Sequence, residues 1–339
     1  MSFEGVGTNE GLVEDLYEQY RGDPASVPDR WQEYFAAQDR DNGQAASPAP
    51  TISTADGPTP DGPTPDDRTP DDRTPDDRTT DDADRSEPLR GVHARIVENM
   101  EASLTVPTAT SVRSVPAKLL EVNRQILNNH LGRTGRGKVS FTHLIAYAVV
   151  RALDEFPNLT SSYAETDGKP TIVRHPHLNL GLAVDVERKD GTRSLLVPNV
   201  KRAEALDFTG FWGAYEALIR KVRSGQMSPD DFVGTTGTIT NPGMIGTVHS
   251  VPRLMPGQGF ILGVGAIGFP SEYEGADPQA LARLGVSTVT TLTNTYDHRI
   301  IGGAESGEFL RRVHDLILGG PTADGVGFYD AVFQRLAVP

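Results

Sequence analysis

The chain of 339 residues contains no cysteine. A disulfide framework, a thiolate metal site and a cysteine nucleophile are therefore excluded. Met1 is not followed by a basic segment and an apolar run, and no apolar stretch approaches the roughly 18 to 20 residues that span a bilayer. We expect a cytoplasmic protein without membrane contact and without a metal site.

Negative charge is concentrated at one end of the chain. The net charge is −14, and residues 1–85 account for all of it, with 21 acidic and seven basic side chains. Residues 86–339 carry 25 of each sign. Sequence-independent binding of nucleic acid needs a basic surface that displaces counterions, so we expect no nucleic-acid partner. The neutral part is compatible with one folded domain.

Residues 1–41 have the pattern of two short helices, with apolar side chains at helical spacing: Leu12, Val13, Leu16, Tyr17 and Tyr20 in the first, and Trp31, Tyr34 and Phe35 in the second. A piece of this size buries too little surface to be very stable alone. We expect its aromatic side chains to contact a partner, because exposed aromatic patches usually mark interfaces. The alternative is that they pack on the main domain of this chain.

Residues 42–88 are expected to form a disordered linker. Five-residue units such as Asp66-Asp67-Arg68-Thr69-Pro70 repeat in tandem, and residues 56–85 hold 11 Asp and four Arg. The segment has hardly an apolar side chain to offset the entropy of ordering, and its prolines and charges favour an extended chain. The spacing of the Asp pairs lacks the alternating ligands of a calcium loop.

Residues 89–339 have the composition of a folded α/β domain around a mixed sheet. Expected helices are 91–104, 117–131, 142–155, 208–224 and 305–318, and expected strands are 107–116, 178–186, 194–200, 236–240, 260–266 and 288–295, with a turn at 189–191. Gly263 to Gly268 resembles a dinucleotide loop, but Pro270 excludes the helix that such a loop needs. His175 and His177 lack a third metal ligand.

One histidine stands out in the run Thr295-Tyr-Asp-His-Arg-Ile-Ile-Gly-Gly-Ala304. His298 lies at the end of a Thr-rich strand, between Asp297 and Arg299, with a double glycine and a helix behind it. An imidazole held there can work as a general base. A single histidine is more often structural. The β-run Gly234 to Gly246, which ends in hydroxyl residues and a Gly-rich turn, makes the catalytic interpretation stronger.

These two segments, in this order, resemble the catalytic domain of the dihydrolipoamide acyltransferases of 2-oxo acid dehydrogenase complexes. The resemblance runs from about Leu89 to the C-terminus and includes Lys201 and three further segments, 193–198, 223–231 and 261–264. It implies a chloramphenicol acetyltransferase-like mixed sheet with flanking helices. Residues 1–41 resemble the N-terminal segment of the 2-oxoglutarate dehydrogenase component.

That order of segments resembles the front of the actinobacterial multifunctional 2-oxoglutarate dehydrogenase/decarboxylase. The expected division is residues 1–41 for the helical segment, 42–88 for the linker and 89–339 for the succinyltransferase domain. The thiamine-dependent module of that family does not follow here, so we expect no thiamine diphosphate or Mg on this chain. No lipoyl domain precedes the catalytic part, so the lipoyl group should arrive in trans on another acyltransferase.

The resemblance also implies roles for individual residues. His298 would take the proton of the coenzyme A thiol, and the thiolate would attack succinyl-dihydrolipoamide. A hydroxyl at Thr240 would meet the oxyanion, Asp297 and Arg299 would support the histidine, and Lys201 would contact coenzyme A. The family is trimeric, so His298 should face Thr240 of a neighbour. Expected partners are a thiamine-dependent dehydrogenase component and dihydrolipoamide dehydrogenase.

Two positions depart from the family pattern. The motif His-x-x-x-Asp-Gly carries Gly302 in place of Asp, and Gly265 falls near a position where succinyl-specific relatives carry a recognition residue. An alternative function is therefore a catalytically weak trimeric scaffold that recruits dehydrogenase components through its N-terminal helices. A free-standing acetyltransferase of the chloramphenicol type is a third possibility, for which the aromatic N-terminal segment and the linker have no use.

Overall fold

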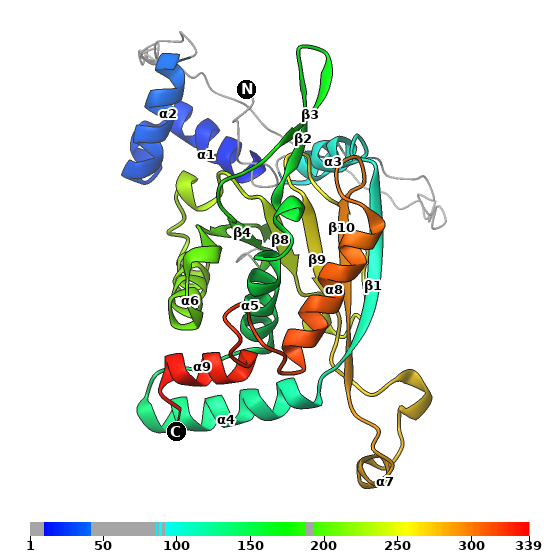
Figure 1. Ribbon diagram of the computed structural model, residues 1–339. Helices are drawn as coiled ribbons and strands as arrows, with labels where there is room; N and C mark the ends of the chain where they lie inside the picture. Colours follow the sequence, from blue (N-terminus) through cyan, green and yellow to red (C-terminus); the bar gives the residue numbers. More distant parts are fainter. Residues whose placement is uncertain (1–9, 42–85, 87, 90–91, 188–192, 339) are drawn as a thin grey trace, which may run out of the picture.

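The computed structural model describes residues 10–41, 86, 88–89, 92–187 and 193–338 (Figure 1). Nearly all of the predicted linker at 42–88, and the predicted turn at 189–191, lie outside these described residues. None of the helices in the described part of the chain is long and apolar enough to cross a membrane.

A six-stranded sheet forms the centre of the domain, in the order β1-β10-β9-β8-β4-β7. Strand β9 runs antiparallel to β10 and parallel to β8, so the sheet is mixed, and the expected fold class is confirmed. The strands of this sheet are β1 (Thr108–Pro116), β4 (Leu180–Leu182), β7 (Asn199–Val200), β8 (Gly237–Thr240), β9 (Phe260–Val264) and β10 (Val289–Asp297).

Two hairpins stand apart from this sheet: β2 (Ser162–Thr166) with β3 (Lys169–Val173), and β5 (Val184–Glu187) with β6 (Arg193–Leu196). The first of them projects above the domain (Figure 1). Its turn passes through Asp167 and Gly168, whose φ angles of 51° and 71° are both left-handed. Asp-Gly is a favoured pair for this kind of two-residue turn. The hairpin is absent from the sequence-based expectation, although its signal is present.

The helices lie around the sheet, and their bounds are α1 (Glu10–Gly22), α2 (Asp29–Asp41), α3 (Val92–Ser103), α4 (Lys118–Thr134), α5 (Phe141–Leu153), α6 (Phe208–Ser224), α7 (Pro278–Arg283), α8 (Gly303–Ile317) and α9 (Phe328–Leu336). Helix α5 is buried along almost its whole length, as expected for a helix that is apolar all round. It packs against α8, the helix that begins behind the candidate histidine.

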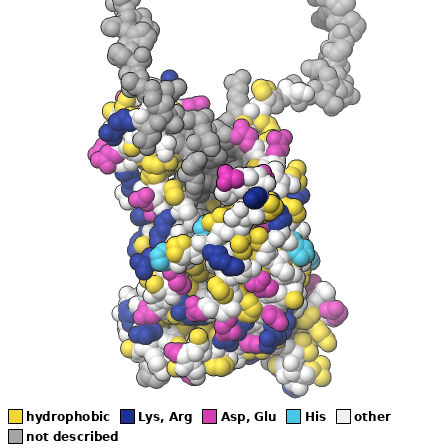
Figure 2. Space-filling view, turned by 45° about the horizontal axis from the view of Figure 1, so that its top comes forward, with side chains coloured by type: hydrophobic (Ala, Val, Ile, Leu, Met, Phe, Trp, Pro, Cys, Tyr) yellow, Lys and Arg dark blue, Asp and Glu magenta, His cyan; other side chains and the backbone are white. Residues whose placement is uncertain are grey.

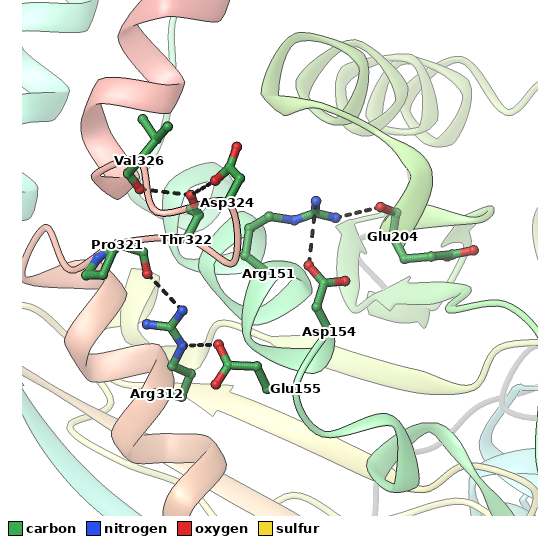
Figure 3. A network of polar contacts seen from close by, with 9 residues as sticks. All are labelled: Arg151, Asp154, Glu155, Glu204, Arg312, Pro321, Thr322, Asp324 and Val326. Carbon is green, nitrogen blue, oxygen red and sulfur yellow. Dashed lines mark hydrogen bonds and ion pairs between the residues drawn. The ribbon is translucent and has the colours of Figure 1, made fainter.

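A polar network braces α8 at its solvent side (Figure 3). Arg312 of α8 donates to a Glu155 carboxylate oxygen at 2.6 Å and to the carbonyl oxygen of Pro321 at 2.8 Å. Arg151 of α5 donates to the Glu204 carbonyl oxygen at 2.7 Å. Arg312 thus ties α8, the helix that begins behind the candidate histidine, to Glu155 just beyond the end of α5 and to the loop before α9.

The N-terminal helices pack on the chain's own domain. The Trp31 side chain is 2% exposed, and its Nε1 donates to the carbonyl oxygen of Met227 at 2.9 Å. Phe35 is fully buried between Trp31 and the tyrosines of α1. The expectation that these aromatics face a partner is therefore wrong for Trp31, which packs on the chain's own domain as in the alternative, and Phe35 is buried among the aromatics of the two N-terminal helices. The domain itself offers the carbonyl and the apolar surface that Trp31 needs.

Candidate active site

His298 lies in the turn that follows β10, and its side chain is exposed. Its backbone N–H donates to the Pro107 carbonyl oxygen at 2.9 Å. The ring Nδ1 lies 3.0 Å from the carbonyl oxygen of Ile301. Because a carbonyl oxygen can only accept, Nδ1 carries the hydrogen and donates it. The lone pair of the neutral ring is then on Nε2, the nitrogen that can accept a proton.

The turn is held by backbone bonds that the sequence makes locally. The Asp297 carbonyl oxygen accepts from the N–H groups of Ile300 and Ile301 at 3.2 and 3.0 Å. Gly302 then adopts an extended backbone, with φ −79° and ψ 151°, and α8 begins at the next residue. A Cβ atom added at Gly302 would meet nothing within 4 Å. The position that holds Asp in the family motif therefore has room for a side chain.

Asp297 and Arg299 pair with each other beside the histidine. Arg299 Nε and Nη2 lie 2.9 and 2.7 Å from the two carboxylate oxygens of Asp297, which is 2% exposed. The hydrogen bond with Asp297 raises the pKa of the Arg299 guanidinium. That guanidinium also stacks on the Tyr163 ring, 3.8 Å from its centroid. The pair is thus a fixed ionic contact packed on an aromatic ring.

Thr240 ends β8 and lies far from His298 within one chain. Thr240 pairs with Gly263 of β9, which pairs with Thr293 of β10. His298 lies five residues beyond Thr293, toward the opposite end of β9. At a rise of about 3.3 Å per residue, the two side chains are separated by roughly 17 Å along the strands alone. One chain therefore does not bring them together.

The loop that follows Thr240 exposes a group of apolar side chains. Met244 and Ile245 are each 80% exposed, and Val248 and Val251 are 65% and 63% exposed. Such concentrated exposure is unusual in a monomer and marks an interaction surface. The Thr240 end of the sheet therefore has an apolar surface where a protein partner could pack.

Lys201 lies at the far edge of the sheet from β10, directly after β7. Its Nζ donates to the Val233 carbonyl oxygen at 2.5 Å, and burial lowers the pKa of its amine. The structure therefore does not bring Lys201 to His298 within one chain. Figure 2 shows basic and acidic side chains interspersed over the end of the domain that faces the viewer. No large surface of one sign is visible there.

Several other sequence candidates have structural roles. A Cβ atom at Gly265 would come within 1.8 Å of the Val248 carbonyl oxygen, so this position has no room for a recognition side chain. His175 contacts Ser162 at 2.9 Å, and His177 contacts Glu204 at the same distance. The described residues contain no group of three or more side chains suited to hold a metal ion.

Comparison with known families identifies the domain. Residues 81–322 match the catalytic domain of the 2-oxoacid dehydrogenases acyltransferase family. The chain belongs to this acyltransferase family. Residues 6–42 match the 2-oxoglutarate dehydrogenase N-terminus. Both matches agree with the resemblance found in the sequence.

Two relatives of this acyltransferase carry the description "multifunctional 2-oxoglutarate metabolism enzyme". The protein of Mycolicibacterium vanbaalenii is 47% identical over 98% of this chain and 29% of its own length. The protein of Mycobacterium sp. strain JLS is 53% identical over 76% of this chain and 20% of its own length. The chain therefore spans less than a third of these relatives.

Solved acyltransferases share the fold. A probable dihydrolipoamide acetyltransferase of Listeria monocytogenes is 25% identical, with a TM-score of 0.58 over 69% of this chain and 94% of its own. The dihydrolipoamide acetyltransferase of Azotobacter vinelandii is 27% identical, with a TM-score of 0.58 over 72% of this chain and 95% of its own. In the Azotobacter enzyme a serine, a histidine and, four residues later, an asparagine were investigated for their roles in catalysis.

Two residues beside the histidine turn are absent from the sequence-based expectation. Asn158, in the short 3-10 helix Pro157–Thr160, donates to the carbonyl oxygen of Ile300 at 2.9 Å. Tyr163 lies beneath Arg299. Both contacts join segments more than 130 residues apart, so no local pattern reveals them. The signal near Asn158, Phe156-Pro157, indicates only the end of a helix.

Proposed function

We propose that this acyltransferase moves a succinyl group between dihydrolipoamide and coenzyme A in the 2-oxoglutarate dehydrogenase system. One observation carries the acyl-transfer chemistry: the exposed His298 keeps Nε2 free, because its Nδ1 hydrogen is donated to Ile301. Two findings support succinyl as the acyl group that is transferred: the match to the 2-oxoglutarate dehydrogenase N-terminus and the description of the relatives. Decarboxylation of 2-oxoglutarate leaves a succinyl unit.

The proposed step begins with proton transfer from the coenzyme A thiol to Nε2 of His298. A thiol with a pKa near 8.5 is mostly protonated at neutral pH and needs such a base. The thiolate attacks the thioester carbonyl of succinyl-dihydrolipoamide, and the hydroxyl of Thr240 donates to the oxyanion. The intermediate then releases the dihydrolipoamide thiolate, which takes the proton back from the imidazolium. Succinyl-coenzyme A and dihydrolipoamide result.

A homotrimer would complete this site. Thr240 and His298 lie at opposite ends of the sheet in one chain, and the apolar side chains after Thr240 are exposed. Packing that loop against the histidine turn of a neighbour would bury the apolar surface and bring the two groups together. The lipoyl group would then arrive on a separate lipoyl-bearing acyltransferase, and a thiamine-dependent dehydrogenase and dihydrolipoamide dehydrogenase would supply and reoxidise it. Lys201 remains a candidate contact for coenzyme A.

A trimeric scaffold with little activity is the second candidate, because Gly302 lacks the side chain of the family motif. The packing of Trp31 on the chain's own domain weakens this candidate, since Trp31 and Phe35, two of the aromatics expected to recruit a partner, are already buried. Catalysis is therefore the function that the geometry supports best.

Succinyl transfer by the wild type and by His298→Ala tests the proposal. Loss of the base should lower kcat on the order of 10² to 10⁴-fold, and equal rates would refute it.

Mixing inactive His298→Ala and Thr240→Val chains tests the shared site. In an equimolar mixture that reassociates at random, about one quarter of all sites combine an intact His298 with an intact Thr240, so activity should return. A mixture as inactive as its components would refute the shared site.

A further inference from the structure

The position of Ile301 decides where the His298 ring points. Its carbonyl oxygen receives the Nδ1 hydrogen, so any movement of this carbonyl turns the ring and moves Nε2. Within the turn, the backbone bonds of Ile300 and Ile301 run to Asp297, and the backbone bond that leaves the turn runs from the His298 N–H to the Pro107 carbonyl oxygen. Gly302 adds no side-chain cap to α8 and no contact across the turn. The His298 ring also lies edge-on to Tyr296, with ring centroids 5.5 Å apart. The Ile300 and Arg299 side of the turn is held by side chains from outside it.

Asn158 supplies one external contact. Its Nδ2 donates to the carbonyl oxygen of Ile300 at 2.9 Å and to a carboxylate oxygen of Glu305 at 3.1 Å. Ile300 lies in the turn, and Glu305 lies in the first turn of α8. The Asn158 Oδ1 accepts a hydrogen bond from Arg174 at 3.3 Å. One amide thus joins the histidine turn, the helix behind it and the segment after β3.

Tyr163 supplies the second contact. It belongs to β2, next to the buried Ser162, which is bonded to His175 at 2.9 Å. The Arg299 guanidinium lies over the Tyr163 ring, 3.8 Å from its centroid. The hydrogen bonds from Arg299 to Asp297 hold the guanidinium in this place. The residue that follows His298 is therefore confined between a buried carboxylate and an aromatic face.

We infer that Asn158 and Tyr163 are positioning residues that hold the His298 turn so that Nε2 meets the incoming thiol. This inference rests on the proposed function of His298 as the base. Neither residue touches His298 itself in the structure, and both act through its neighbours Ile300 and Arg299. They secure the turn although Gly302 has no side chain.

The test compares Asn158→Leu with a matched control. Leucine has a similar size but no donor, so it removes the bonds to Ile300 and Glu305. A small displacement of a catalytic group lowers rates steeply, and we expect kcat to fall about 10- to 100-fold with KM changed less than about threefold. Tyr163→Leu should act in the same direction, and Tyr163→Phe should keep the wild-type kcat because it keeps the ring.

Asn128→Leu is the control for a merely structural effect. Asn128 also joins its amide to backbone groups, accepting from Val139 N–H at 2.7 Å and donating to the Val139 carbonyl at 2.9 Å, but it lies on α4 away from the histidine turn. It should lower the melting temperature and leave kcat unchanged. If Asn158→Leu and Asn128→Leu change kcat equally, the positioning role is wrong.

A second readout does not depend on activity. The ¹⁵N shifts of the His298 ring report which nitrogen carries the hydrogen, and the wild type should show the Nδ1-protonated form. Asn158→Leu should show a mixture of tautomers, and an unchanged ring would overturn the inference. If the His298→Ala variant transfers succinyl groups as fast as the wild type, the proposed function fails instead, whatever the ring shows.

Discussion

The two halves of the proposed site differ in how they are built. At the His298 end, the turn is joined to its own chain by backbone bonds, an ionic pair and an amide from the segment after α5. At the Thr240 end, the hydroxyl is followed by a loop whose apolar side chains are exposed. The proposed base is therefore preorganised within one chain, whereas the proposed oxyanion donor lies beside a surface that a second chain would have to cover.

This difference assigns separate tasks to folding and to assembly. Folding of one chain sets the tautomer and direction of the imidazole. Association of chains would supply the donor for the oxyanion and exclude water from the site. Variants at the two ends should accordingly fail in different ways.

After His298→Ala, the largest loss of kcat is expected at the Thr240 end. Thr240→Val removes the hydroxyl and keeps the volume, and kcat for succinyl transfer should fall on the order of 10² to 10³-fold. Thr238→Val is the control two residues earlier on the same strand, where the hydroxyl is bonded to buried Gln258 at 2.6 Å. It should cost stability and leave kcat nearly unchanged. Equal losses of kcat in the two variants would mean that Thr240 is not the donor.

The next largest effect is on the free energy of unfolding and is expected at His143 in α5. His143 lies in the first turn of α5 and forms a capping box with the N-cap residue Ser140. Its Nδ1 accepts from the Ser140 N–H at 3.0 Å, and its Nε2 lies 3.2 Å from a Glu216 oxygen. Burial nevertheless lowers the pKa of His143 to about 4. The unfolded chain then binds the extra proton between pH 6.5 and about 4, so stability is complete above pH 6.5 and falls as the pH drops toward 4.

The loss at His143 should reach about 3 kcal/mol of unfolding free energy at low pH. His143→Gln keeps a Ser-x-x-Gln capping box and removes the titration. Urea unfolding at pH 7 and pH 5 should show a smaller decrease for this variant than for the wild type. A decrease of the same size in both proteins would show that another group causes the acid sensitivity.

The smallest effect is expected at Gly302, at the His298 end. Gly302→Asp has room for its side chain, and the extended backbone suits an N-cap of α8. We expect a gain of a few tenths to about 1 kcal/mol in stability. Because Asn158 and Tyr163 already hold the turn, kcat should change less than about threefold. A tenfold rise in kcat would show that the His298 end is not preorganised and would remove the contrast between the two ends.

The sequence predicts local features of this molecule better than long-range ones. Strand β10, the histidine turn and α8 follow from a Thr-rich run, a double glycine and an amphipathic helix, and all three occur where expected. Helix α6 has the predicted bounds. The β2–β3 hairpin was signalled by Asp167-Gly168, but its strands are short and mostly polar, so they gave little periodicity.

Contacts between distant segments could not be predicted in this way. The Trp31 bond to Met227 spans 196 residues, and the Asn158 bond to Ile300 spans 142. The aromatic stripe of α2 indicates that Trp31 will be buried, but not by which surface. Likewise, a lone asparagine after Phe-Pro shows no partner until the sheet brings β10 to it. Family resemblance proposed His298 and Thr240 as candidates, whereas the contacts that hold the His298 turn required the fold.

The chain has only two tryptophans, Trp31 and Trp212, and they lie in different parts of the molecule. Trp31 docks the N-terminal helices, and Trp212 is buried in α6. The fluorescence of the two indoles can therefore be separated by substituting one of them. With Trp212→Phe, the remaining fluorescence comes from the docked α2 alone, so a red shift or quenching by acrylamide would follow its release from the domain. The protein thus carries its own spectroscopic label for this contact.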